Sequence, residues 1–178
     1  LSQTITGLLW KWLLNSNYGP AVYAIRALTG GGVDFLNGVW PARLSLILAN
    51  LWNTMPIAVI LTLAALQTIS QDGYEAAMVD GSTGLNAFRH ITLPMTMPTV
   101  AMMIVMQSME YFYMVTLMLV LPGGGPFGST TTLSLMAYKE GFAFWHIGQG
   151  TAYSIIIFAL NILFSLIYLK LLNRREAC

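Results

Sequence analysis

Charged side chains are scarce in this chain of 178 residues. Lysine, arginine, aspartate and glutamate together make up 8% of the sequence, whereas a soluble domain carries about 25%. So few charges cannot cover the surface of a soluble fold of this size. Disorder is excluded as well, because it requires low hydrophobicity and 56% of these residues are hydrophobic. The composition indicates an integral membrane protein.

Other absences narrow the classes of function. The single cysteine, Cys178, excludes a disulfide framework and a thiolate metal site. A net charge of +1 provides no field for gripping nucleic acid, so no nucleic-acid partner is expected. His90 and His146 lack a second ligand three or four residues away, so we predict no metal site. No catalytic grouping of side chains is visible, and we expect neither an enzyme nor a cofactor.

Three long runs with few charges predict three transmembrane helices, since about 20 apolar residues cross the hydrocarbon core. The runs are residues 44–71, 99–121 and 147–169, and only the second contains a charge, Glu110. Leu1–Leu14 is apolar but short, and Lys11 interrupts it. It is either the tail of a truncated span or an interfacial helix. The predicted fold is an all-α polytopic membrane helical bundle of three full transmembrane helices plus an N-terminal partial one.

The flanks of the predicted spans suggest an orientation. The sequence begins at Leu1, and no basic region precedes an apolar stretch, so we expect no signal peptide. Turns are expected at Asn15–Pro20 and at Gly30–Gly32. Basic residues divide equally between the two sides of the membrane, but a cluster directly follows the last span: Lys170, Arg174 and Arg175. The positive-inside rule then places the C-terminus and residues 72–94 in the cytoplasm.

Residues 72–94 form the only long polar stretch. Asp72 is a candidate N-cap, and Glu75 follows three residues later as in a capping box. A second short helix is predicted over Leu85–Thr92, so the stretch reads as helix–turn–helix. Residues predicted to end the two helices, by positive φ or by a missing N–H, are Gly81, Gly84 and Pro94.

The spacing in this stretch resembles the signature of permeases from binding-protein-dependent ABC importers. That signature reads Glu-Ala-Ala, three residues, glycine, nine residues and Ile-x-Leu-Pro. It is filled here by Glu75, Ala76, Ala77, Gly81, Ile91, Leu93 and Pro94. Asp80 and Pro98 are similar to the carbohydrate-uptake branch, which includes maltose-type and glycerol-3-phosphate-type permeases. Such permeases have six or more spans, so this chain resembles their C-terminal part.

The resemblance implies a role in transport. Residues 1–178 would be a partial importer transmembrane domain, with residues 72–94 as the cytoplasmic loop that couples it to an ATPase. The implied partners are two ATP-binding subunits, a second and different permease subunit, an extracytoplasmic solute-binding protein and membrane lipid. The sequence contains no G-x-x-x-x-G-K-[ST] motif, so ATP is handled by another chain. The implied coupling residues are the signature positions together with Asp80. Glu75 would pair with a basic group of the ATPase or cap its own helix.

Polar residues inside the predicted spans suggest a solute pathway, because each is costly in lipid. They share helix faces by their spacing and are Asn50, Asn53, Gln107, Glu110 and Tyr111. Amides and an aromatic ring suit a sugar or polyol, and Glu110 would disfavour an anion. Alternatively, the amides hydrogen-bond between helices, and Glu110 pairs with a basic group or lies near the outer interface. Other solute classes (glycerol-3-phosphate, an amino acid) and a truncated membrane scaffold without transport remain open.

Overall fold

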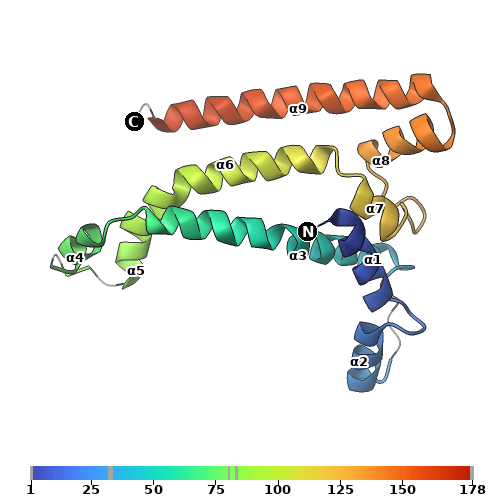
Figure 1. The fold of residues 1–178 in the computed structure, drawn as a ribbon, viewed down its shortest axis with the longest axis horizontal. Coiled ribbons are helices and arrows are strands. Elements are labelled where there is room, and N and C mark those ends of the chain that lie inside the picture. Colours follow the sequence, from blue (N-terminus) through green and yellow to red (C-terminus); the bar gives the residue numbers. More distant parts are fainter. Residues whose placement is uncertain (1, 32–33, 80, 83, 177–178) are drawn as a thin grey trace. The chain divides into compact units, whose positions relative to one another are not determined.

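The computed structural model describes residues 2–31, 34–79, 81–82 and 84–176, without the side chains of residues 169 and 171–176. Within these residues the chain is helical and contains no strand (Figure 1). The helices in chain order are α1 (Gln3–Leu13), α2 (Pro20–Thr29), α3 (Val39–Gln67), α4 (Gln71–Val79), α5 (Gly84–Ala87), the π-helix η1 (Phe88–Thr92), α6 (Leu93–Phe112), α7 (Thr116–Val120), α8 (Leu133–Tyr138), the π-helix η2 (Lys139–Ala143) and α9 (Ile147–Glu176). The predicted all-α class is confirmed.

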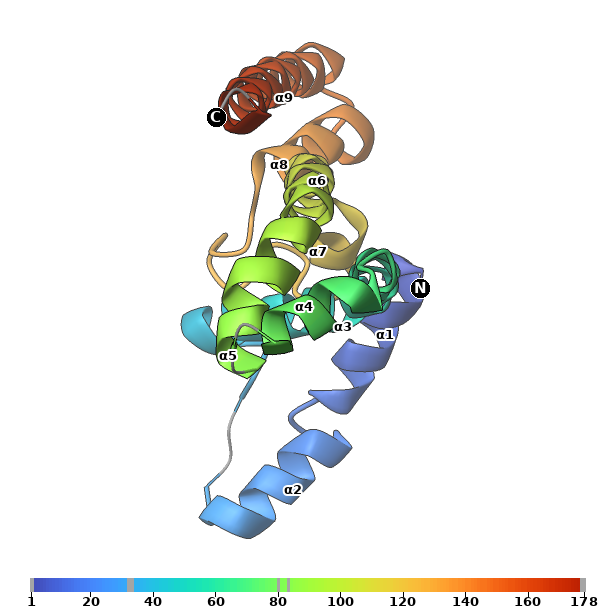
Figure 2. The same cartoon turned by 90° about the vertical axis from the view of Figure 1, so that its left-hand side faces the viewer.

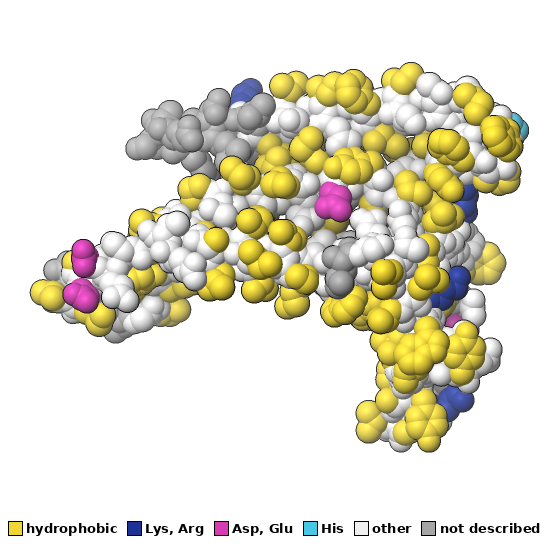
Figure 3. All heavy atoms as spheres, viewed as in Figure 1, with side chains coloured by type: hydrophobic (Ala, Val, Ile, Leu, Met, Phe, Trp, Pro, Cys, Tyr) yellow, Lys and Arg dark blue, Asp and Glu magenta, His cyan; other side chains and the backbone are white. Residues whose placement is uncertain are grey.

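In the described part of the chain, three helical stretches are long and apolar enough to cross a membrane. They are Val39–Gln67, Gly84–Phe112 and Ile147–Tyr168. At most 11% of the most apolar part of each stretch is buried inside the protein, so their side chains face outward, where lipid can cover them. Hydrophobic side chains accordingly dominate the surface in Figure 3. The predicted number of spans is confirmed.

The predicted end of the second span is wrong. We expected it to run over 99–121, but α6 ends at Phe112, and α7 begins as a separate helix at Thr116. Tertiary contacts cause the break: the Met114 side chain is buried, and its carbonyl accepts a hydrogen bond from Ser134 Oγ at 3.0 Å. Such a bond compensates the backbone group that leaving the helix frees. The first span also begins five residues and ends four residues earlier than predicted.

The chain divides into two compact units, Leu1–Thr54 with Met109–Cys178, and Met55–Ser108. In the first unit, α1 lies beside α7 (Figure 1). The core of this unit joins the start of α3 to α7 and consists of Leu46, Ala49, Met114, Leu117 and Leu121. The first predicted turn lies between α1 and α2, with Pro20 already in α2, and Gly30 ends α2 with φ +70°. Gly32 of the second predicted turn lies outside the described residues.

The last two helices of the first unit meet through glycine. α8 and η2 fold back against the beginning of α9, as Figures 1 and 2 show. A Cβ on Gly150 would lie 2.8 Å from the Cα of Gly141, so the two backbones can approach this closely only without a side chain there. Farther along α9, the rings of Phe112 and Phe164 are 4.8 Å apart. These contacts fix the third span within its unit.

Candidate functional site

The 72–94 loop belongs to the second unit and forms the predicted helix–turn–helix from α4, α5 and η1. Gly81 has φ +76°. Its N–H donates to the Met78 carbonyl, and the Ser82 N–H donates to the Ala77 carbonyl. This hydrogen-bond pair is the Schellman motif that ends a helix with a left-handed residue. The predicted role of Gly81 in the turn is confirmed.

Three finer predictions about this loop are wrong. α4 begins at Gln71, so Asp72 lies within its first turn, and Ser70 occupies the position before the helix, where serine caps equally well. Gly84 begins α5 and has no positive φ. Pro94 does not stop the second helix: the wide π turn of η1 leads directly into α6, with the proline in its first turn, where no backbone N–H is needed.

A hydrogen bond joins α4 to η1 within the loop. The Tyr74 hydroxyl of α4 lies 2.7 Å from the Thr92 hydroxyl of η1. Thr92 is buried, and its carbonyl accepts a hydrogen bond from the equally buried Thr96 at 2.8 Å. Sequence reasoning missed this contact, because an 18-residue separation carries no periodic signal.

The outer surface of the loop is exposed and partly apolar. α4 and α5 bury none of their residues. Acidic side chains gather where α4 lies (Figure 3), and the apolar side chains most exposed on the loop are Met78, Val79, Leu85 and Phe88. Glu75 and Ala76 are exposed, whereas Ala77 and Ile91 are half-buried. Asp80 lies outside the described residues. Among the described residues, Glu75 makes no hydrogen bond or ion pair.

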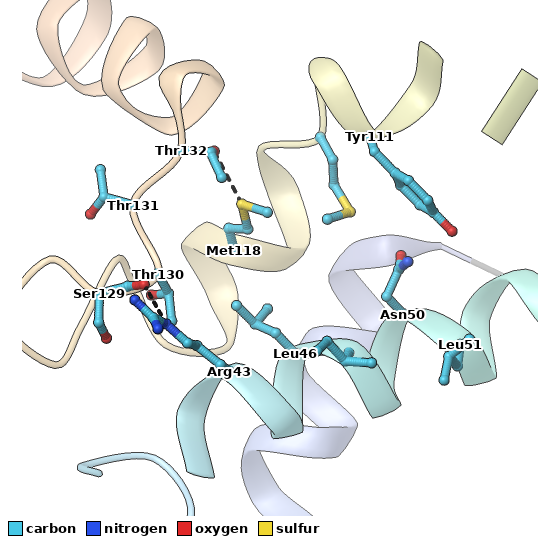
Figure 4. A pocket seen from close by; sticks show the side chains of 12 residues that line it. Arg43, Leu46, Asn50, Leu51, Tyr111, Met118, Ser129, Thr130, Thr131 and Thr132 are labelled. Carbon is cyan, nitrogen blue, oxygen red and sulfur yellow. Dashed lines mark hydrogen bonds between the residues drawn. The ribbon is translucent and has the colours of Figure 1, made fainter. Parts of the chain in front are cut away.

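A pocket of about 510 Å³ opens in the first unit (Figure 4). Asn50 of α3 and Tyr111 of α6 lie at one end of it, and Arg43 lies at the other beside Ser129 and Thr130. The remaining lining residues are Leu46, Ile47, Leu51, Met114, Met118, Thr131 and Thr132. The volume falls within the range of small-ligand sites, and a mostly apolar lining with a few polar groups is typical of them.

The other predicted pathway residues are not among the described residues that line this pocket. Asn53 donates to the Thr6 hydroxyl of α1 at 2.7 Å, which is the predicted alternative of an interhelical hydrogen bond. Glu110 accepts a hydrogen bond from Gln3 at 3.3 Å. Gln107 belongs to the second unit, and its buried side-chain oxygen has no partner among the described residues. Of the predicted set, Asn50 and Tyr111 share the pocket.

Sequence reasoning missed the polar end of the pocket. Arg43 precedes Asn50 by seven residues, or about two helical turns, and this spacing was the available signal. Its Nε donates to the Ser129 carbonyl at 3.1 Å. Two lysines donate to carbonyls of the same segment, Lys139 to Gly123 at 2.8 Å and Lys11 to Val120 at 3.2 Å. Basic side chains from three helical elements therefore hold the segment from Val120 to Ser129, which forms one wall of the pocket.

Among the described carboxyl groups outside the spans, that of Asp34 has a clearly shifted pKa. Hydrogen bonds to Asp34, led by the one from the Asn37 side chain at 2.7 Å, lower its pKa below 3.8. The Ser16 hydroxyl, at 2.9 Å, acts in the same direction. The ionised form of Asp34 therefore stabilises the turn that precedes α3.

Together, the helical architecture, the three apolar spans and the exposed signature loop define a polytopic membrane protein of the transport class. The chain belongs to the family of binding-protein-dependent transport system inner membrane components, whose sequence pattern matches residues 5–176. This family consists of transport proteins of the membrane.

Two similar proteins are named as permeases of sugar and glycoside transport systems. The trehalose/maltose transport system permease protein MalF of Thermococcus litoralis is 34% identical over 93% of this chain. The sulfoquinovosyl glycerol transport system permease protein SmoG of Agrobacterium fabrum is 28% identical over 99%. These alignments cover 56% and 57% of the two relatives, so the chain spans little more than half of their length.

A solved structure shares the fold. It is the crystal structure of a bacterial ABC transporter involved in the import of the acidic polysaccharide alginate, with a TM-score of 0.84 at 24% identity. The similarity covers 98% of this chain and 61% of that one. A second structure, the alginate transporter in complex with an alginate pentasaccharide-bound periplasmic protein, matches with a TM-score of 0.80 at 25% identity over 94% of this chain and 59% of that one.

Proposed function

We propose that this chain is a membrane-spanning part of an ABC importer permease that moves a sugar or related glycoside into the cell. The observation that carries the proposal is the exposed 72–94 loop with the permease signature. A loop that only joined two spans would have no need of four exposed apolar side chains, which are Met78, Val79, Leu85 and Phe88. Several exposed large apolar side chains in one polar loop are consistent with a protein interface.

In this proposal the loop lies in the cytoplasm and docks onto a separate ATP-binding subunit. Glu75 has no partner within the described part of the chain, so its carboxylate is available to a basic group of that subunit. Ala76 leaves room for close approach. The Schellman turn at Gly81 and the Tyr74–Thr92 hydrogen bond make the loop a unit able to transmit force to α3 and α6.

The solute passes, in this proposal, through the pocket that Asn50 and Tyr111 line. The amide provides a donor and an acceptor for sugar hydroxyl groups, and the aromatic ring can stack on the apolar face of a pyranose. Support comes from the two named relatives, whose transport systems carry a disaccharide and a glycoside. A second permease subunit, a second ATP-binding subunit and an extracytoplasmic binding protein complete the proposed transporter.

Site-directed crosslinking tests the docking. A single cysteine at Val79, which is 88% exposed, is expected to crosslink to the ATP-binding subunit that copurifies with the complete transporter. A cysteine at Tyr23, exposed to 77% on α2, is the matched control and is expected to give no such product. Equal crosslinking at both positions, or none at Val79, would contradict the proposal.

A further inference from the structure

The pocket has two polar ends on one face of α3. Arg43 and Asn50 are seven residues apart, which places them on the same helix face about 10 Å apart along the axis. Between them the wall is apolar, with Leu46 and Met118. A solute that fills this pocket must therefore present two separate polar groups, and the two ends offer different chemistry.

The Arg43 guanidinium is held in place by two contacts, and some of its N–H donors remain available to a ligand. Its Nε donates to the Ser129 carbonyl, and its Cζ atom lies 5.2 Å from the centre of the Trp40 ring. Among the described residues, its two terminal amino groups make no hydrogen bond. Such a fixed fork matches the two oxygens of a carboxylate, sulfonate or phosphate.

A buried hydroxyl beside Arg43 also lacks a partner. The Ser129 Oγ is buried and has no hydrogen-bond partner within the described residues. By contrast, the neighbouring Thr130 hydroxyl donates to the Gly125 carbonyl at 2.7 Å. The Ser129 hydroxyl is covered by protein atoms, so it is not part of the surface that this end of the pocket presents to a ligand.

The charges around this end are positive. No aspartate or glutamate is among the described residues that line the pocket. The Glu110 carboxylate, which we expected to disfavour an anion, hydrogen-bonds Gln3 and is not part of the lining. Arg43 is exposed, so a neutral sugar would leave its charge to water, whereas an anionic group would form charge-assisted hydrogen bonds with it.

We propose that Arg43 determines specificity by binding an anionic group, so that the transported solute is a short saccharide or glycoside carrying a carboxylate, sulfonate or phosphate. This inference rests on the proposed function as a sugar importer. The sugar ring occupies the end with Asn50 and Tyr111, and the anionic group occupies the end with Arg43 and Ser129.

The test compares two disaccharides that differ in one group. Labelled maltose is compared with the analogue in which one hydroxymethyl group is a carboxylate, using the complete transporter in proteoliposomes. The kcat/KM ratio of acidic to neutral solute is measured for the wild type and for Arg43→Gln, Arg43→Lys and Lys139→Gln. Lys139 is the matched control. Like Arg43, it donates to a backbone carbonyl of the segment that forms one wall of the pocket, but it does not line the pocket.

Wild type is expected to prefer the acidic solute. Arg43→Gln should lower the ratio by about tenfold or more, because it removes a charge-assisted hydrogen bond, and Arg43→Lys should restore part of it. Lys139→Gln should change both rates equally. The binding protein is the same throughout, so a changed ratio reports the permease.

Three results would overturn the inference. They are equal or faster wild-type transport of maltose, an unchanged ratio in Arg43→Gln, and transport of neither disaccharide by a complex that moves another neutral sugar. If Arg43→Gln does not assemble, the wild-type ratio and the Arg43→Lys ratio still decide. A complex that transports no saccharide at all would instead refute the proposed function.

Discussion

Gly81 offers the sharpest test of the turn in the 72–94 loop. An added Cβ would meet no atom of the described residues within 4 Å, so the φ of +76° is the constraint that a substitution would violate. Holding an L-residue in the left-handed region costs about 1–2 kcal/mol. Gly81→Val is therefore expected to lower the population of the closed turn by roughly 5- to 30-fold.

Gly84 provides the matched control, because a Cβ there also meets nothing within 4 Å while its φ is not positive. Hydrogen exchange of the Ser82 amide, which donates across the turn, should accelerate by that factor in Gly81→Val and stay unchanged in Gly84→Val. Transport-coupled ATP hydrolysis by the complete transporter should fall in Gly81→Val alone. Equal behaviour of the two variants in both assays would refute the reasoning.

Three further predictions concern contacts elsewhere. Tyr74→Phe is expected to destabilise the loop by about 0.5–1.5 kcal/mol, and a double-mutant cycle with Thr92→Val in thermal unfolding should show that the two losses do not add. Gly150→Leu should destabilise the packing of α9 on η2 by about 1–3 kcal/mol, whereas Gly148→Leu, where a Cβ meets nothing within 4 Å, should not; equal melting temperatures would contradict this. The lowered pKa of Asp34 means that its stabilisation is present above pH 3.8 and is lost as the pH falls through the folded-state pKa. Normalised exchange of the amides before α3 should accelerate over that range, but not in Asp34→Asn.

The sequence predicts what depends on local chemistry. Runs without charges locate the spans because hydrocarbon excludes charge, and the third span begins at Ile147 as expected. Gly81 is identifiable because a helix followed by a left-handed turn favours glycine. The all-α class follows from the requirement that the backbone satisfy itself in lipid.

The features of the fold and of the site that could not be predicted from the sequence depend on tertiary contacts. The break after Phe112 follows from the burial of Met114 and its bond to Ser134, and apolar composition continues across it without a signal. Pro94 was predicted to end a helix. Because η1 continues directly into α6, Pro94 lies instead in the first turn of α6, where it does not interrupt the helix. The pathway residues were chosen by helix face, yet only contacts reveal that Asn53 is engaged by Thr6.

The pocket shows the same limit. Asn50 and Tyr111 were selected because a polar side chain inside a span is unfavourable unless it has a role. Both line the pocket. Arg43 was counted only as a flanking charge. Its position opposite them depends on the segment around Ser129, which three cations hold in place.

The most direct test of the account is the side of the membrane on which the 72–94 loop lies. A cysteine at Val79, in a chain whose single native Cys178 is replaced by serine, is treated with a membrane-impermeant maleimide in vesicles of both orientations. Labelling is expected in inside-out vesicles and protection in right-side-out ones. Labelling from the outer face would contradict the role of this loop in binding an ATPase.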